Sequence, residues 1–205
     1  MSQKSQQQRR SQREQLRLDR EKAAKQHRIR RVLTVAASAL VVVLIAFGLW
    51  SAAPTSGGAG GPAPGFTLPT TAGTTVSLAD LRGKPVVLYF NEGAGCGSCT
   101  VQMAEIEKDP GFAEAGITVL PIVMNTAEQI MPDLMRYGVT TPYLLDDGRV
   151  SQAYDVLGTG MHEGLPGHGF VLVDADGTKL WHGNYPSMWL DPQDLLKEAT
   201  SRLAS

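Results

Sequence analysis

Short runs of apolar residues alternate with amphipathic segments along the chain from residue 66 onward. Three of these runs are almost continuously apolar, which is typical of strands covered on both faces, and they lie at 84–90, 117–124 and 169–174. Helices are predicted between and after them, at 96–109, 126–137, 151–156 and 192–203. This order predicts an α/β layer sandwich, with a mixed sheet and helices on both of its faces.

Turn and capping residues set the ends of the remaining elements. A β-hairpin is predicted at 66–77, and a second hairpin joins the 169–174 run to a strand at 179–182. Pro132 predicts a kink or a break in the helix that contains it. Four further signals are a helical turn at 78–83 capped by Ser77, a helix end at Pro110, a short strand at 143–145, and an N-cap at Asp191 before Pro192.

An uncharged segment of nineteen residues lies at 32–50. Its length is about the minimum for a helix that crosses a hydrocarbon core of roughly 30 Å. A basic cluster ends directly before it at Arg31 and the next basic residue is Arg82, so the N-terminus is predicted to be cytoplasmic. We therefore expect a single-pass protein of the cell membrane, with its globular domain outside the cytoplasm. The alternatives are a signal peptide cleaved near 51–53 and a twin-arginine signal at Arg30-Arg31.

Charge divides the chain into two parts of opposite sign. Residues 1–31 hold eleven Lys or Arg against three acidic residues, a net charge of +8, and the remainder carries −9. This arm cannot build a core, and because an apolar segment follows it, we interpret it as a cytoplasmic arm and expect no nucleic-acid partner. Residues 51–65 are rich in Gly, Pro and Ala and predict a linker. The globular domain is then 66–205.

The chain contains only two cysteines, Cys96 and Cys99. They follow a predicted buried strand and open a predicted helix, where free N–H groups and the positive end of the macrodipole stabilise a thiolate. Because thiolate is the reactive form in disulfide exchange, we predict that Cys96 attacks and Cys99 resolves. The alternatives are half of a zinc site and a pair of inert thiols. Zinc needs two more ligands, and the histidines of the globular part are irregularly spaced, at 162, 168 and 182.

Four segments carry a family resemblance, namely 63–68, 76–90, the CxxC motif and 170–177. Together they resemble the thioredoxin-fold proteins of the bacterial cell envelope, the ResA/TlpA-like group, and the wider peroxiredoxin (AhpC/TSA, redoxin) superfamily. The resemblance covers residue 64 to the C-terminus. It implies a thioredoxin-like fold, with a mixed central sheet, flanking helices and an N-terminal β-hairpin extension, here preceded by one transmembrane helix. Such proteins are commonly tethered to the membrane outside the cytoplasm.

The chain departs from these families around the motif. Gly95 stands where a tryptophan often precedes the first cysteine, and the CGSC centre lacks the proline of thioredoxin. Peroxiredoxins have proline and threonine seven and three residues before the peroxidatic cysteine, and these positions hold Tyr89 and Gly93. A cis-proline normally precedes the aspartate of the last long strand by about six residues, a place that His168 takes. Either Leu165-Pro166 is the cis bond, or His168 faces the thiols.

Two more residues are candidates for the reaction. As imidazolium, His168 stabilises the Cys96 thiolate, or it serves as an acid for the leaving sulfur; the alternative is a satisfied loop residue. Glu92, four residues before Cys96, is a candidate proton acceptor, with a solvated loop acid as the alternative. The candidate site is therefore Cys96, Cys99, His168 and Glu92. No cofactor and no resident metal is expected.

These residues predict an enzyme, a membrane-tethered extracytoplasmic thiol-disulfide oxidoreductase that acts on protein thiols or disulfides. One alternative is a peroxiredoxin-like thiol peroxidase, with Cys96 peroxidatic and Cys99 resolving. Another is a Sco-type copper chaperone with His168 or His162 as the third ligand, although those proteins have three residues between the cysteines. A purely structural disulfide that closes so short a loop contributes little stability. Because the chain has no third cysteine, a redox partner must recycle the disulfide.

Overall fold

The structure is a computed structural model of the chain, and it describes residues 31, 33–35, 37–46, 55–57, 60–158 and 163–205. The chain divides into two units, Met1–Ser51 and Ala52–Ser205. The elements of the second unit are, in order, β1 (Thr55–Gly57), β2 (Thr67–Pro69), β3 (Thr75–Ser77), the 3₁₀ helix η1 (Leu78–Leu81), β4 (Val86–Asn91), α2 (Gly97–Lys108), α3 (Pro110–Glu114), β5 (Thr118–Val123), α4 (Ala127–Tyr137), β6 (Leu144–Leu145), α5 (Arg149–Ala153), β7 (His168–Val173), β8 (Lys179–Asn184) and α6 (Pro192–Leu203).

In the first unit, residues 33–35 and 37–46 are helical. No helix among the described residues is both long enough and apolar enough to cross a membrane. Positions 32, 36 and 47–50 of the predicted span lie outside the described residues, as do residues 1–30 of the predicted arm. The membrane span and its topology therefore stay predictions.

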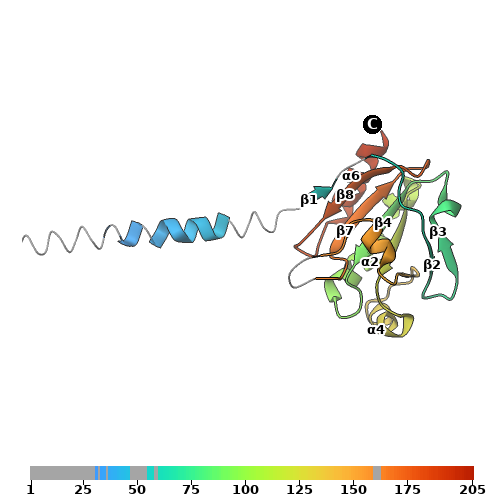
Figure 1. The fold of residues 1–205 in the computed structure, drawn as a ribbon, viewed down its shortest axis with the longest axis horizontal. Helices are drawn as coiled ribbons and strands as arrows, with labels where there is room; N and C mark the ends of the chain where they lie inside the picture. Colours follow the sequence, from blue (N-terminus) through green and yellow to red (C-terminus); the bar gives the residue numbers. More distant parts are fainter. Residues whose placement is uncertain (1–30, 32, 36, 47–54, 58–59, 159–162) are drawn as a thin grey trace, which may run out of the picture. The chain divides into compact units, whose positions relative to one another are not determined.

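A six-stranded mixed sheet forms the centre of the second unit, with the strand order β1-β8-β7-β4-β5-β6 (Figure 1). Strand β4 pairs parallel with β5, and β5 pairs parallel with β6. Strand β7 pairs antiparallel with both β4 and β8. Parallel neighbours need crossover connections, which the helices supply, whereas β7 and β8 form a hairpin. Strands β2 and β3 make a separate hairpin before β4, so the predicted mixed sheet and N-terminal hairpin are confirmed.

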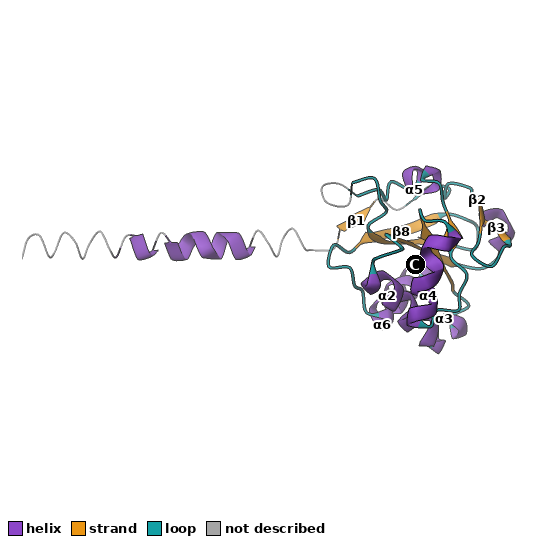
Figure 2. Ribbon diagram, turned by 90° about the horizontal axis from the view of Figure 1, so that it is seen from below, coloured by secondary structure: helices purple, strands orange, loops and turns teal. Residues whose placement is uncertain are grey.

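Alternate residues of β4 face two different layers. Val87 and Tyr89 belong to a core cluster that includes residues of α2, α4 and α6. Val86, Leu88 and Phe90 belong to a second cluster, which includes residues of the β2–β3 hairpin and the segment after α5. Figure 2 shows α2, α4 and α6 on one side of the sheet and α5 on the other. Both faces of β4 are covered, which explains why its apolar run is continuous.

Several predicted ends are confirmed, and two predictions, a break at Pro132 and a cap by Ser77, need correction. Helix α6 begins at Pro192, and the side chain of Asp191 accepts a hydrogen bond from the N–H of Gln193 at 2.9 Å. Helix α4 runs through Pro132 without a break. Proline has no N–H to donate to the carbonyl four residues earlier in the helix. Because Pro132 is exposed, water can bind that carbonyl instead. The predicted Ser77 cap forms no side-chain hydrogen bond to η1.

Two elements were not predicted. Strand β1 lies within the predicted 51–65 linker and pairs with the edge of β8 through its backbone. The segment is rich in glycine and has no alternating apolar pattern, so the sequence did not predict this strand. Helix α3 begins at Pro110, with the carboxylate of Asp109 accepting the N–H of Gly111 at 2.9 Å. Proline ends α2 as predicted, but it also suits the first position of a new helix.

Candidate active site

The register of β4 and β7 brings polar groups from both strands to one face. Asn91 pairs with His168, and Tyr89 pairs with Phe170. Residues two apart on a strand share a face, so these side chains lie toward the layer that contains α2. Tyr89 stacks on Phe170 with ring centroids 4.6 Å apart and packs edge-on against His168 at 5.0 Å. The end of β4 then leads directly into the CxxC motif.

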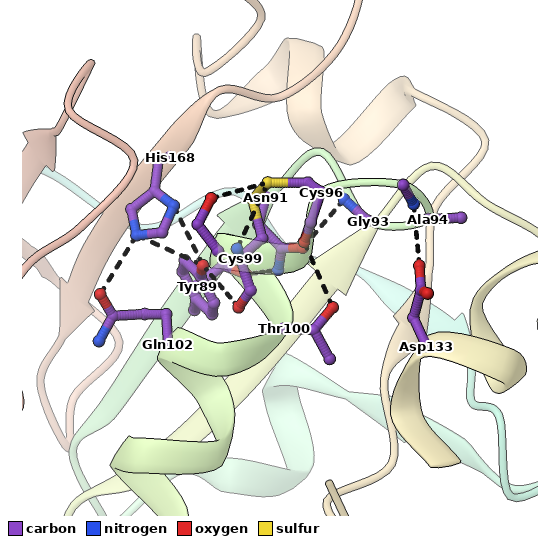
Figure 3. Close-up of a disulfide and its surroundings, with 12 residues drawn as sticks. Tyr89, Asn91, Gly93, Ala94, Cys96, Cys99, Thr100, Gln102, Asp133 and His168 are labelled. Carbon is purple, nitrogen blue, oxygen red and sulfur yellow. Dashed lines mark hydrogen bonds between the residues drawn. A yellow bond between two sulfur atoms is a disulfide. The ribbon is translucent and has the colours of Figure 1, made fainter. Parts of the chain in front are cut away.

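Cys96 and Cys99 form a disulfide at the N-terminus of α2, with their Cα atoms 5.3 Å apart (Figure 3). Cys96 is the N-cap residue, and its Sγ accepts a hydrogen bond from the N–H of Cys99 at 3.3 Å. Cys96 is partly exposed, whereas Cys99 is fully buried. In the reduced protein the same N–H groups stabilise a thiolate on Cys96. Cys96 is thus the more accessible sulfur, as the sequence predicts, and the order of attack stays a prediction.

The loop before Cys96 is held by side chains from three elements or their ends. The N–H of Gly93 donates to Asn91 Oδ1 at 3.1 Å, and the N–H of Ala94 donates to Asn125 Oδ1 at 2.9 Å. The N–H of Gly95 donates to Asp133 Oδ2 at 2.8 Å. Three consecutive N–H groups of this tight loop therefore have side-chain acceptors, which hold the backbone before Cys96.

Gly93 stands at the place where peroxiredoxins carry threonine, and its backbone explains the difference. Its φ is +76°, in the left-handed region that favours glycine. A Cβ atom added there lies 1.8 Å from Asn125 Oδ1, the acceptor of the Ala94 N–H. The present loop therefore has no room for a threonine side chain at this position.

Tyr89 stands at the peroxiredoxin proline position and contacts the CxxC motif from strand β4. Its hydroxyl donates to the backbone carbonyl of Cys99 at 3.1 Å and lies 3.2 Å from Nδ1 of His168. Burial, followed by the charges of Tyr143 and Glu92, raises the pKa of Tyr89 well above its ordinary value. The phenol is thus neutral and available as a hydrogen-bond donor.

His168 begins β7 and is buried beside Tyr89. The described residues contain no cis peptide bond, so Leu165-Pro166 is trans, and His168 itself lies on the active-site face. Its Nε2 lies 3.4 Å from Oε1 of Gln102 on α2. Burial lowers the pKa of His168 to about 4. The ring is therefore neutral near pH 7, which argues against the predicted role of an imidazolium that stabilises the Cys96 thiolate.

Glu92 is the remaining predicted site residue, and the other histidines of the globular part are His162 and His182. Glu92 is half-buried directly after β4, and its charge contributes to the raised pKa of Tyr89. His162 lies outside the described residues, and His182 is on β8. No group of three or more His, Cys, Asp or Glu that could hold a metal ion occurs within the part of the chain that the structure describes.

Sequence reasoning missed the polar residues that hold the motif: Asn91, Gln102, Asn125 and Asp133. Gln102 lies three residues after Cys99 on the same helix, and this spacing places both residues on neighbouring parts of one face. That spacing was a usable signal. Asn125 and Asp133 come from after β5 and from α4, so only the folded chain brings them to the loop.

Comparison with known proteins gives the family of this site. The AhpC/TSA family profile matches residues 59–179. The chain belongs to the AhpC/TSA family. A relative in Mycobacterium tuberculosis that carries the name of a peroxiredoxin is 36% identical over 124 residues, which cover 58% of this chain and 79% of that protein. The thiol-disulfide oxidoreductase ResA of Bacillus subtilis is 33% identical over 100 residues, which cover 47% of this chain and 55% of ResA.

The crystal structure of peroxidoxin BcpB from Mycobacterium tuberculosis superposes with a TM-score of 0.58 at 21% identity, covering 71% of this chain and 96% of that one. This similarity shows a thioredoxin-like α/β fold, as the sequence predicted. Within the AhpC/TSA family, the protein is an enzyme of thiol-based redox chemistry, a thiol-disulfide oxidoreductase or a thiol-dependent peroxidase.

Proposed function

We propose that the protein is a thiol-dependent peroxidase in which Cys96 is the peroxidatic cysteine and Cys99 the resolving cysteine. The observation that carries this proposal is the placement of the two sulfurs. Cys96 Sγ is partly open to solvent and accepts an N–H from the first turn of α2, while the buried Cys99 lies within disulfide distance. The peroxiredoxin relative is more similar than ResA and is matched over more of its length.

The reaction balances with these two residues and a peroxide. The Cys96 thiolate attacks one peroxide oxygen, the O–O bond breaks, and the leaving hydroxide or alkoxide takes a proton from solvent, which leaves a sulfenic acid on Cys96. The Cys99 thiol loses its proton, and its sulfur attacks the Cys96 sulfur and expels hydroxide, which becomes water. Two electrons pass from the thiols to the peroxide. An external dithiol must then reduce Cys96–Cys99, so a redox partner is part of the proposal.

A hydroxyl group lies beside the attacking sulfur despite the missing threonine. Ser98 is exposed on the first turn of α2, and its Oγ lies 3.5 Å from Cys96 Sγ. A hydroxyl at this distance can donate to a thiolate or to an approaching peroxide oxygen. Ser98 therefore supplies, from the other side of Cys96, a donor that Gly93 cannot supply.

The test is the rate at which reduced full-length protein reacts with hydrogen peroxide, followed by loss of free thiols in rapid mixing. We expect oxidation at least about 100-fold faster than that of free cysteine at the same thiolate fraction, since preorganised donors at a reacting centre have effects of this size. Cys99→Ser should leave this first step intact. Oxidation no faster than that of free cysteine would overturn the peroxidase proposal.

One observation favours a second function. Tyr89 and Gly93 stand where peroxiredoxins carry the proline and the threonine that precede the peroxidatic cysteine. If these changes remove peroxide activation, the same two cysteines act as a thiol-disulfide oxidoreductase. Cys96 then attacks a protein disulfide and Cys99 resolves the mixed disulfide. Faster reaction of the reduced protein with a protein disulfide than with hydrogen peroxide, at equal concentrations, would favour this second function.

We also propose that residues 32–50 anchor the protein in the cell membrane, with the AhpC/TSA domain outside the cytoplasm. The support is the uncharged segment and the basic residues that precede it. In intact bacteria that express the protein, a membrane-impermeant maleimide should label reduced Cys96. Labelling that appears only after lysis would contradict this topology.

A further inference from the structure

A series of polar contacts links Gln102, His168 and Tyr89 to the backbone of Cys99 (Figure 3). We call it the polar chain. The N–H of Leu190 donates to Gln102 Oε1 at 2.8 Å, and this oxygen lies 3.4 Å from His168 Nε2. Nδ1 of the same ring lies 3.2 Å from the Tyr89 hydroxyl, which donates to the Cys99 carbonyl at 3.1 Å. Tyr89, His168 and Gln102 are at most 1% exposed, so these contacts lie away from solvent.

The donors and acceptors of the polar chain favour one tautomer of the His168 ring. Leu190 donates to Gln102 Oε1, so that atom is the amide oxygen, and only an N–H can approach it. In the tautomer that satisfies this oxygen, Nε2 carries the hydrogen and Nδ1 has a free lone pair; the Tyr89 hydroxyl lies 3.2 Å from Nδ1 and 3.4 Å from Nε2. The Tyr89 hydroxyl has one proton and two acceptors at nearly equal distances, Nδ1 and the Cys99 carbonyl.

The last member of the polar chain acts on the backbone of the resolving cysteine. Cys99 is fully buried, and its carbonyl belongs to the first turn of α2. Tyr89 is anchored in central strand β4 by its stacking on Phe170. Its hydroxyl therefore ties the first turn of the helix to a central strand of the sheet. A contact of this kind limits where the Cys99 sulfur lies once the disulfide is open.

We propose that Tyr89 is a positioning residue for the resolving step: its hydroxyl holds Cys99 where its sulfur closes onto an adduct at Cys96, and Nδ1 of His168 competes with the Cys99 carbonyl for the hydroxyl proton. The inference rests on the proposed function only in the order of the two cysteines, with Cys96 attacking and Cys99 resolving. It applies equally to a sulfenic acid and to a mixed disulfide at Cys96.

Burial keeps these polar groups neutral. For Tyr89, burial raises the pKa most, and Tyr143 and Glu92 raise it further. Burial lowers the pKa of His168 to about 4, and its polar neighbours are Tyr89 and Gln102. Neither group changes charge between about pH 6 and pH 9, so the positioning effect should be constant across that range.

The experiment isolates the resolving step without peroxide. Reduced full-length protein is mixed with one equivalent of the aromatic disulfide DTNB, and release of the coloured thiolate TNB is followed by rapid mixing. Cys96 attacks DTNB and releases the first TNB, leaving TNB bound to Cys96. The Cys99 sulfur then attacks the Cys96 sulfur, releases the second TNB and forms the Cys96–Cys99 disulfide, while the Cys99 proton goes to solvent. The two phases report attack and resolution separately.

In Tyr89→Phe, which keeps the ring and removes only the hydroxyl, we expect the second phase to slow about 3- to 10-fold, the effect of one net hydrogen bond, with the first phase unchanged. The Cys96–Cys99 reduction potential should become less negative by about 15–30 mV, the same factor expressed for a two-electron couple. Tyr143→Phe is the matched control. Tyr143 is also fully buried, and among the described residues its hydroxyl has no hydrogen-bond partner. It should change neither phase nor the potential.

Two substitutions of His168 test this competition. Asn can place an acceptor near the position of Nδ1, whereas Gln places its polar end near that of Nε2 and leaves the Tyr89 proton to the Cys99 carbonyl. The second phase should therefore be no slower in His168→Gln than in His168→Asn. Combining either substitution with Tyr89→Phe should add less than the sum of the single effects, because both act through one contact.

Equal slowing of both phases in Tyr89→Phe, an unchanged second phase, or a similar loss in Tyr143→Phe would overturn the inference. Failure of the peroxidase proposal looks different, since it leaves the DTNB phases intact and removes only fast oxidation by peroxide.

Discussion

Cys96 and Cys99 share one bond, yet their surroundings are opposite. On the Cys96 side the sulfur is partly open, its neighbours Gly95 and Ser98 are exposed, and its contacts come from the helix N-terminus and one surface hydroxyl. On the Cys99 side the residue is fully buried, and its backbone is held by the hydroxyl of Tyr89. One helical turn separates the partly exposed Cys96 from the buried Cys99.

Under the proposed function, this difference assigns attack to the exposed sulfur and resolution to the buried one. An exposed thiolate can meet a substrate, whereas a buried thiol cannot, and it reacts only with the sulfur beside it. Resolution is intramolecular, so its rate depends on how well Cys99 is held rather than on access. The helix N-terminus activates the exposed sulfur, and the contact with β4 positions the buried one.

The strongest way to break this comparison is to remove each sulfur in turn. Cys96→Ser should lower both peroxide and DTNB reactivity by more than about 100-fold, because the remaining thiol is buried. Cys99→Ser should react at the normal first-phase rate, release a single TNB, and accumulate a Cys96 sulfenic acid that dimedone traps. The measurements are thiol counts and the mass of the dimedone adduct. Wild-type reactivity in Cys96→Ser would mean that Cys96 is not the attacking sulfur.

The next largest effect should come from the loop on the Cys96 side. Gly93→Thr restores the residue that peroxiredoxins carry, but it places a β-branched side chain at φ +76° and against Asn125 Oδ1. Backbone strain and the loss of the Ala94–Asn125 hydrogen bond should together lower the free energy of unfolding by about 3 kcal/mol. Urea denaturation measures this. Gly95→Ala, also at positive φ but with open space around its Cβ, is the control. It should lower the free energy of unfolding by about 1 kcal/mol.

Most of the Cys96 side was predictable from the sequence. The apolar run of β4 and the two cysteines after it predicted a buried strand, a turn and a helix N-terminus, and the structure has all three. These features depend on local periodicity and capping, which single segments carry. The thioredoxin-like fold was predicted from motifs of the same local kind.

The Cys99 side was not predictable in the same way. Tyr89 lies in a run of apolar residues, and nothing local distinguishes a tyrosine that donates to a catalytic helix from one that only packs. Its role depends on the register of β4 against β7, which sets it beside His168. Similarly, burial makes His168 a neutral ring, whereas the sequence left open whether it is an imidazolium, an acid for the leaving sulfur or a satisfied loop residue. Long-range pairing and desolvation are properties of the folded chain only.

The burial of His168 should also appear as a pH dependence of stability. Its pKa falls from 6.5 in the unfolded chain to about 4 in the native protein. Between these values the unfolded chain binds more protons, so stability is full above pH 6.5 and is lost as the pH falls toward 4. The loss from about pH 7 to pH 5 should be about 2 kcal/mol. His168→Asn should remove it in urea denaturation, and His182→Asn, whose ring is less buried, should remove less. The same slope in wild type and His168→Asn would mean that the ring is charged in the native state.

The smallest expected effect concerns the surface hydroxyl on the Cys96 side. Ser98 Oγ lies 3.5 Å from Cys96 Sγ, and a donor at that distance favours the thiolate over the thiol. Ser98→Ala should lower the ultraviolet absorbance of the Cys96 thiolate in the reduced protein near neutral pH, and should slow peroxide oxidation about 2- to 5-fold. The second DTNB phase should be unchanged, because the hydroxyl faces the exposed sulfur and not Cys99. Ser201→Ala on α6 is the control for losing an exposed serine. Slowing of the second phase in Ser98→Ala would show that the two sides of the disulfide are not independent, and the division of roles between an open attacking sulfur and a fixed resolving sulfur would then fail.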